Sequence, residues 1–101
     1  MVVLIIKLPI LEYWKVAKSS GLSKVCWYWR LARAFIVGDE IFIMRWASNS
    51  VTLLAHELGH WHGLEHTLKC TIMNPCGFLR WAIAPEEKGL IEEAEKMIKA
   101  G

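Results

Sequence analysis

All four histidines of the chain lie in one stretch that decides the fold, His56-Glu57-Leu58-Gly59-His60-Trp61-His62-Gly63-Leu64-Glu65-His66. Residues 51–61 follow a polar break with cap-forming residues at 47–50, which predicts that a helix begins there. Gly63 predicts where that helix ends, because glycine adopts the left-handed conformation of a helix terminus without a Cβ penalty. We therefore expect a helix over residues 51–61, followed by a reversal of the chain at Gly63.

The histidine spacing predicts a metal site. His56 and His60 are four residues apart, so a helix places them on one face, one turn from each other. Two imidazoles on a rigid helix are preorganised zinc ligands, and a catalytic zinc needs a third protein ligand. His66 would lie ~15 Å along a continuous helix from His56. The reversal at Gly63 is what lets His66 join the other two, and we predict these three histidines as the metal ligands.

The sequence also predicts roles for the acidic residues near these histidines and for the fourth histidine. Glu57 points about a quarter of a turn away from the ligand face. It could sit beside the metal without ligating it and accept a proton from metal-bound water, so we predict Glu57 as the general base. Glu65 is expected to be an exposed loop acid, and His62 to have a surface or hydrogen-bonding role. Glu86 and Glu87 remain alternative carboxylate ligands.

The same residues resemble a known family. H-E-x-x-H-x-x-G-x-x-H is the zinc-binding signature of the metzincin metallopeptidases, and residues 56–66 match it at every specified position. The stretch Cys70-Thr71-Ile72-Met73-Asn74-Pro75 resembles the family's Met-turn, and residues 50–55 resemble its approach to the active-site helix. The resemblance covers about residues 50–75. It implies a zinc-dependent endopeptidase that uses a zinc-bound water and Glu57, with Gly63 and Met73 as structural support of the site.

The chain also departs from the family pattern. It is shorter than most metzincin domains, which makes it similar to a minimal, archaemetzincin-like member. Some metzincins carry a tyrosine two residues after the turn methionine, where this chain has Pro75, so no tyrosine assistance is expected. Archaeal-type metzincins bind a second zinc through cysteines. Cys70 and Cys76 match that arrangement only in part, so we predict one zinc ion.

The pattern of the remaining chain predicts an α+β fold. Residues 2–8 are typical of a buried strand, and residues 10–18 have apolar positions at helical spacing. Residues 24–33 favour a strand, with a helix over residues 27–35 as the alternative, and Trp27-Tyr28-Trp29 would pack in the core or line a groove. Gly38-Asp39 predicts a hairpin over residues 34–45. Residues 69–84 should be mostly loop, and Pro85-Glu86-Glu87 opens a last helix.

The order contains no internal repeat and no linker, so we predict one domain over residues 1–101, and the resemblance implies that it is a minimal zincin-like domain. A small, twisted, mostly antiparallel sheet would pack against the active-site helix, with a C-terminal helix completing the domain. A peptide substrate would add as a strand to an edge within residues 34–45.

Composition limits the partners. The net charge is only +2 and the basic residues are scattered, which argues against nucleic acid. No stretch approaches the ~18 apolar residues of a membrane span. The lack of an export signal points to the cytoplasm, where Cys26, Cys70 and Cys76 would stay as buried thiols. A hydrophobic fraction of 54% leaves apolar surface that could support self-association.

Two other functions remain open beside the peptidase. One is a zinc-binding latent or non-catalytic interaction protein, which the short chain favours. The other is a zinc-dependent ribonuclease, since a bacterial ribosomal-RNA maturation family is similar in its H-x-x-x-H-x-x-x-x-x-H spacing. That family lacks a glutamate after the first histidine, where this chain has Glu57.

Overall fold

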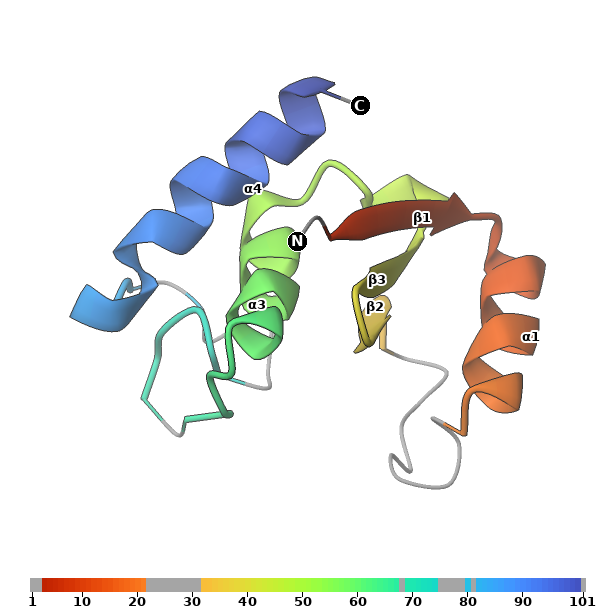
Figure 1. Cartoon of the computed structure of the whole chain (residues 1–101), viewed down its shortest axis with the longest axis horizontal. Coiled ribbons are helices and arrows are strands. Elements are labelled where there is room, and N and C mark those ends of the chain that lie inside the picture. The colour runs from red at the N-terminus through yellow and green to blue at the C-terminus, as the bar shows by residue number, and fades with distance from the viewer. Residues whose placement is uncertain (1–2, 22–31, 68, 75–79, 81, 101) are drawn as a thin grey trace. The chain divides into compact units, whose positions relative to one another are not determined.

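The computed structural model describes residues 3–21, 32–67, 69–74, 80 and 82–100 (Figure 1). These residues form two compact units, Met1–Ser48 and Asn49–Gly101, and each is described by itself. Across the described residues the regular elements are three strands and three helices, which is an α+β fold as predicted. They are β1 (Leu4–Leu8), α1 (Ile10–Ser19), β2 (Ala34–Val37), β3 (Glu40–Met44), α3 (Val51–Trp61) and α4 (Lys88–Ala100), with 3-10 turns at Arg45–Ala47 and Pro85–Glu87.

The first unit holds a mixed three-stranded sheet in the order β1-β3-β2. β3 pairs in parallel with β1 and antiparallel with β2. The prediction of a mostly antiparallel sheet is therefore wrong for the β1–β3 pair. The physical reason is the connection after β1, which includes α1, because a parallel pair needs a long crossover rather than a tight turn.

The hairpin predicted at residues 34–45 is confirmed. β2 and β3 are joined by Gly38 and Asp39, and Gly38 has a φ of +59°, the conformation that tight two-residue hairpin turns require. Among the described residues β2 forms one edge of the sheet, and the addition of a substrate strand within 34–45 stays a prediction. The expected strand at 24–33, with Trp27-Tyr28-Trp29, lies outside the described residues.

The helix α1 confirms the prediction for residues 10–18 and supplies core to this unit. Its Tyr13 side chain is fully buried, meets the ring of Phe35 edge-on at 5.5 Å and donates a hydrogen bond to the Ala32 carbonyl at 2.8 Å. The strand predicted at 2–8 is present as β1, but its expected burial is wrong. Leu4 is 56% exposed and none of the five residues of β1 is buried, because the packing leaves both faces of this strand partly open to solvent.

The second unit begins with α3, whose limits match the predicted helix at 51–61. The Ser50 hydroxyl accepts a hydrogen bond from the Leu53 amide at 3.4 Å and caps the first turn. Gly63 has a φ of +90°, and its amide donates to the His60 carbonyl while the Leu64 amide donates to the Gly59 carbonyl. These two bonds are the Schellman motif, so the predicted reversal at Gly63 is confirmed.

The helices α3 and α4 pack against each other in this unit, as Figure 1 shows. The turn at residues 71–74 lies between them in the sequence. A Cβ built on Gly59 of α3 would lie 2.3 Å from Met73 Sδ and 3.3 Å from Leu90 Cδ1 of α4. Gly59 is therefore the point at which both neighbours approach the α3 backbone closely.

The segment predicted as loop, 69–84, contains an isolated bridge between Thr71 and Ala82. Pro85–Glu87 then opens the last helix as predicted. Cys70 is a free, half-buried thiol, whereas Cys26 and Cys76 lie outside the described residues. No helix in the described part of the chain is long and apolar enough to cross a membrane.

Two glycine substitutions test this packing. Gly59→Ala should lower the free energy of unfolding by about 1–3 kcal/mol, because the new methyl group overlaps the buried Met73 side chain. Gly89→Ala is the matched control in α4, where a Cβ meets nothing within 4 Å. It should raise stability by about 1 kcal/mol through helix propensity. Denaturant unfolding of both variants in the presence of a chelator provides the measurement, and equal effects would contradict the close approach at Gly59.

Candidate metal centre

The three predicted ligand histidines converge through their Nε2 atoms. His56 and His60 come from successive turns of α3, and His66 reaches them through the reversal at Gly63. The Nε2–Nε2 distances are 3.1 Å for His56–His60, 3.2 Å for His56–His66 and 3.1 Å for His60–His66. The three side chains are thus close enough to bind one metal ion between them.

Backbone carbonyls orient two of these rings. His56 Nδ1 lies 2.8 Å from the Ile72 carbonyl oxygen, and His60 Nδ1 lies 3.0 Å from the Leu64 carbonyl oxygen. A carbonyl oxygen can only accept, so both Nδ1 atoms carry the proton and donate it. Each neutral ring then presents a bare Nε2 lone pair toward the other. In metal sites, a hydrogen bond of this kind from Nδ1–H to a carbonyl fixes the tautomer of the histidine and leaves Nε2 available to the metal.

The charge state of the rings favours a metal over a proton between them. Burial lowers the pKa of His56 to about 3, and burial also lowers the pKa values of His60 and His66. At neutral pH neither His56 nor His60 therefore supplies a proton for their 3.1 Å contact. A metal ion can accept both lone pairs, which makes the donor set chemically consistent with metal binding.

The geometry of the cluster also suits a tetrahedral ion. Nitrogen ligands at ~2.0–2.1 Å from a tetrahedral zinc are separated by about 3.3–3.4 Å. The observed separations of 3.1–3.2 Å are only slightly shorter. His56 is buried, His60 half-buried and His66 exposed, so the cluster reaches the surface at His66. Imidazole ligands suit zinc, copper, iron and nickel, so the donor set alone does not select one metal.

Glu57 follows His56 in α3 and is only 5% exposed. Burial raises the pKa of its carboxyl to about 7, although the positive charge of Arg80 opposes this shift. A carboxyl with a pKa near neutrality can accept and release a proton at pH 7, which is the property of a general base.

Arg80 is a residue near the site that the sequence did not point to. Its Nε donates to the Asn74 carbonyl at 2.8 Å, which ties it to the turn at 71–74. Its charge helps to lower the pKa values of all three histidines as well as that of Glu57. A lone arginine in a predicted loop carries no spacing signal that could have revealed this.

The turn that contains Met73 lies against the histidines. The Ile72 carbonyl holds His56, and the Met73 carbonyl accepts from the amide of Thr67, the residue after His66. Met73 itself is 2% exposed and lies against Gly59. Its role as structural support of the site stays a prediction. The importance of the Ile72 and Leu64 carbonyls was missed, because backbone acceptors leave no trace in side-chain spacing.

The other acidic residues do not join the cluster. In the described part of the chain the group that could hold a metal ion consists of the three histidines alone. Glu65 and Glu86 are exposed, as expected of Glu65. Glu87 is buried, but hydrogen bonds from the chain already occupy both of its carboxylate oxygens. The geometry therefore favours His66 over Glu86 or Glu87 as the third ligand.

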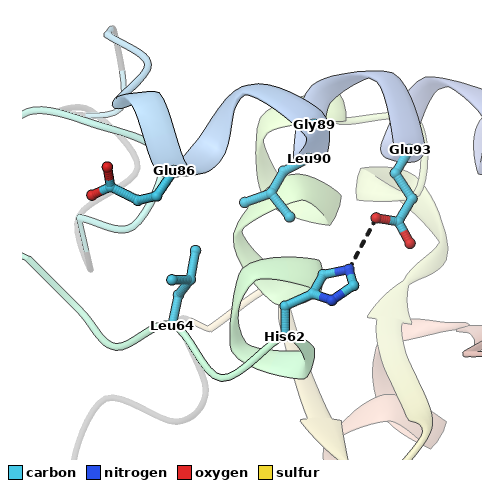
Figure 2. Close-up of a pocket in the computed structure, with 6 residues that line it drawn as sticks. All are labelled: His62, Leu64, Glu86, Gly89, Leu90 and Glu93. Atoms are coloured by element: carbon cyan, nitrogen blue, oxygen red, sulfur yellow. Dashed lines mark hydrogen bonds and ion pairs between the residues drawn. The ribbon is translucent and has the colours of Figure 1, made fainter.

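His62 lies apart from the ligands, as its predicted hydrogen-bonding role requires. Its Nε2 is 3.1 Å from Glu93 Oε2 of α4, an interaction visible in Figure 2. This pair borders a pocket of about 250 Å³ between the end of α3 and the start of α4. Leu64 links the pocket to the cluster, since its side chain lines the pocket while its carbonyl holds His60. The described residues around the pocket are His62, Leu64, Glu86, Gly89, Leu90 and Glu93.

Comparison with known proteins gives no assignment: no family model, curated protein or solved structure matches the chain.

Single alanine substitutions separate the three ligands from the fourth histidine. His56→Ala, His60→Ala or His66→Ala should each weaken Zn²⁺ binding by more than about a hundredfold, since the loss of a hydrogen bond that only orients a ligand already costs about 10–100-fold. His62→Ala should change the affinity by less than about threefold, because its ring contacts Glu93 rather than the cluster. Competition with a chromophoric chelator measures these affinities. Zinc affinity that survives His66→Ala would exclude His66 as a ligand.

Proposed function

We propose that this chain is a zinc-dependent endopeptidase of the metzincin type. The observation that carries the proposal is the convergence of three Nε2 atoms within 3.2 Å, two of them on rings whose Nδ1–H groups are held by carbonyls. The signature that predicted this cluster also places Glu57 directly after the first ligand. The helix α3, the reversal at Gly63 and the turn with Met73 support a zincin-like arrangement of this unit.

Different residues of the chain would have different roles in amide hydrolysis. His56, His60 and His66 would hold one zinc ion, and a zinc ion in such a site polarises a carbonyl and makes water a nucleophile near neutral pH. Glu57 would accept the proton of the attacking water and pass it to the leaving amine. Its burial keeps bulk solvent from competing for that proton.

The substrate class follows from the same proposal. The substrate would be a peptide or an unstructured protein segment, because the cluster is exposed at His66 and an extended backbone can approach it there. The weak net charge continues to argue against RNA.

A carboxyl-to-amide substitution tests the role of Glu57. Glu57→Gln keeps the volume of the buried side chain but removes the base, so cleavage of an unstructured protein should fall by at least about a hundredfold. Zinc content should remain at that of the wild type. Glu65→Gln is the matched control, because Glu65 is an exposed acid of the same stretch and its loss should leave cleavage unchanged.

The same assay distinguishes the competing functions. Full cleavage activity in Glu57→Gln would contradict the general-base role. A zinc-loaded wild type that cleaves no peptide bond would contradict the peptidase and favour a non-catalytic zinc protein. Degradation of RNA without cleavage of protein would favour the ribonuclease.

A further inference from the structure

We propose that Glu87 is a positioning residue of the metal centre, which sets the orientation of the ligand His56 through the Ile72 peptide. The resemblance assigned this residue no such role, and the sequence suggested it only as an alternative ligand. The inference rests on the metal-binding part of the proposed function and does not depend on peptidase activity.

Glu87 is 1% exposed and is placed at the end of the Pro85–Glu87 turn, just before α4. Its two carboxylate oxygens each accept two hydrogen bonds. Oε1 accepts from the amides of Ile72 at 3.2 Å and Ala84 at 2.8 Å. Oε2 accepts from the Thr71 hydroxyl at 3.1 Å and the Met73 amide at 3.0 Å. One buried carboxylate thus holds three consecutive residues of the turn.

The residues of the turn that Glu87 holds also form hydrogen bonds with His56 and with the residue after His66. The Ile72 amide is held by Glu87, while the Ile72 carbonyl accepts the Nδ1–H of His56 at 2.8 Å. The Met73 amide is held by the same carboxylate, and the Met73 carbonyl accepts from Thr67, next to His66. Two of the three ligands are therefore connected to Glu87 through the peptide groups of Ile72 and Met73. Supporting hydrogen bonds of this kind raise metal affinity by holding the ring in its binding orientation.

The chemistry of the four donors requires a carboxylate at this position. A glutamine has the same shape, but one of its two terminal atoms is an NH₂ group that cannot accept. An NH₂ at the Oε1 position would face the amides of Ile72 and Ala84, which are both donors. An NH₂ at the Oε2 position could donate to the Thr71 hydroxyl but would leave the Met73 amide without an acceptor. Either orientation loses at least one bond that holds the turn.

The test compares Glu87→Gln with Glu86→Gln in the full chain. Both substitutions remove one acidic charge, at adjacent positions, but Glu86 is exposed and Glu87 is buried. Glu87→Gln should weaken Zn²⁺ binding by about 10–100-fold, and Glu86→Gln by less than about twofold. Affinities are measured by chelator competition at a temperature at which circular dichroism shows each variant folded. The visible spectrum of bound Co²⁺ supplies a second readout, which should change in Glu87→Gln only, because it reports ligand geometry.

A milder variant keeps the test valid if Glu87→Gln does not fold. Thr71→Val removes one donor to Oε2 and preserves the shape of the side chain, so Zn²⁺ binding should weaken about threefold or more. Thr71→Ser restores the hydroxyl and should restore the affinity. A folded Glu87→Gln or Thr71→Val with the zinc affinity and Co²⁺ spectrum of the wild type would overturn the inference. A wild type that binds no Zn²⁺ would instead overturn the metal site itself.

Discussion

The second unit has to hold two neutral imidazole rings whose unprotonated Nε2 atoms face each other, and the rest of this unit depends on that requirement. His56 and His60 donate their Nδ1–H groups to carbonyls, so their Nε2 lone pairs meet at 3.1 Å without a proton between them. Such an arrangement persists only if the surrounding chain holds both carbonyls in place. The Schellman motif fixes the Leu64 carbonyl, and the turn at 71–74 fixes that of Ile72. Two glycines serve the same arrangement. Gly63 allows the chain to reverse after α3, and Gly59 has no Cβ, which leaves room for the Met73 side chain.

Features with a local cause could be predicted from the sequence. The limits of α3 follow from the Ser50 cap and from Gly63, both of which act within a few residues of the helix. The hairpin follows in the same way from Gly38 and Asp39. The convergence of the histidines was predictable for a similar reason. Helical spacing joins His56 to His60, and the reversal brings in His66 over only six residues.

Features with a distant cause could not be predicted. The parallel pairing of β1 with β3 joins residues separated by the whole of α1 and β2, and no local pattern specifies it. The role of Glu87 in the site is also not specified by any local pattern. Acids in the first turn of a helix are common because they complement its dipole, so the sequence gives Glu87 an ordinary role. Its bonds to Thr71, Ile72 and Met73 span 14 to 16 residues and exist only in the folded chain.

The distribution of buried polar groups indicates what organises the second unit. His56, Glu57, Thr71, Asn74 and Glu87 are all buried there, whereas in the described part of the first unit the buried side chains with polar groups are Ser48 and Tyr13. Apart from the histidine Nε2 atoms, which face one another in the cluster, each buried side-chain nitrogen or oxygen in the described part of the chain has a hydrogen-bond partner. A polar network that is fully satisfied specifies one arrangement of its members, because any alternative leaves a buried group unpaired. Since this network ends at the histidines, a metal ion bound by them would stabilise the same arrangement that the network selects, and metal binding would be coupled to the folding of this unit.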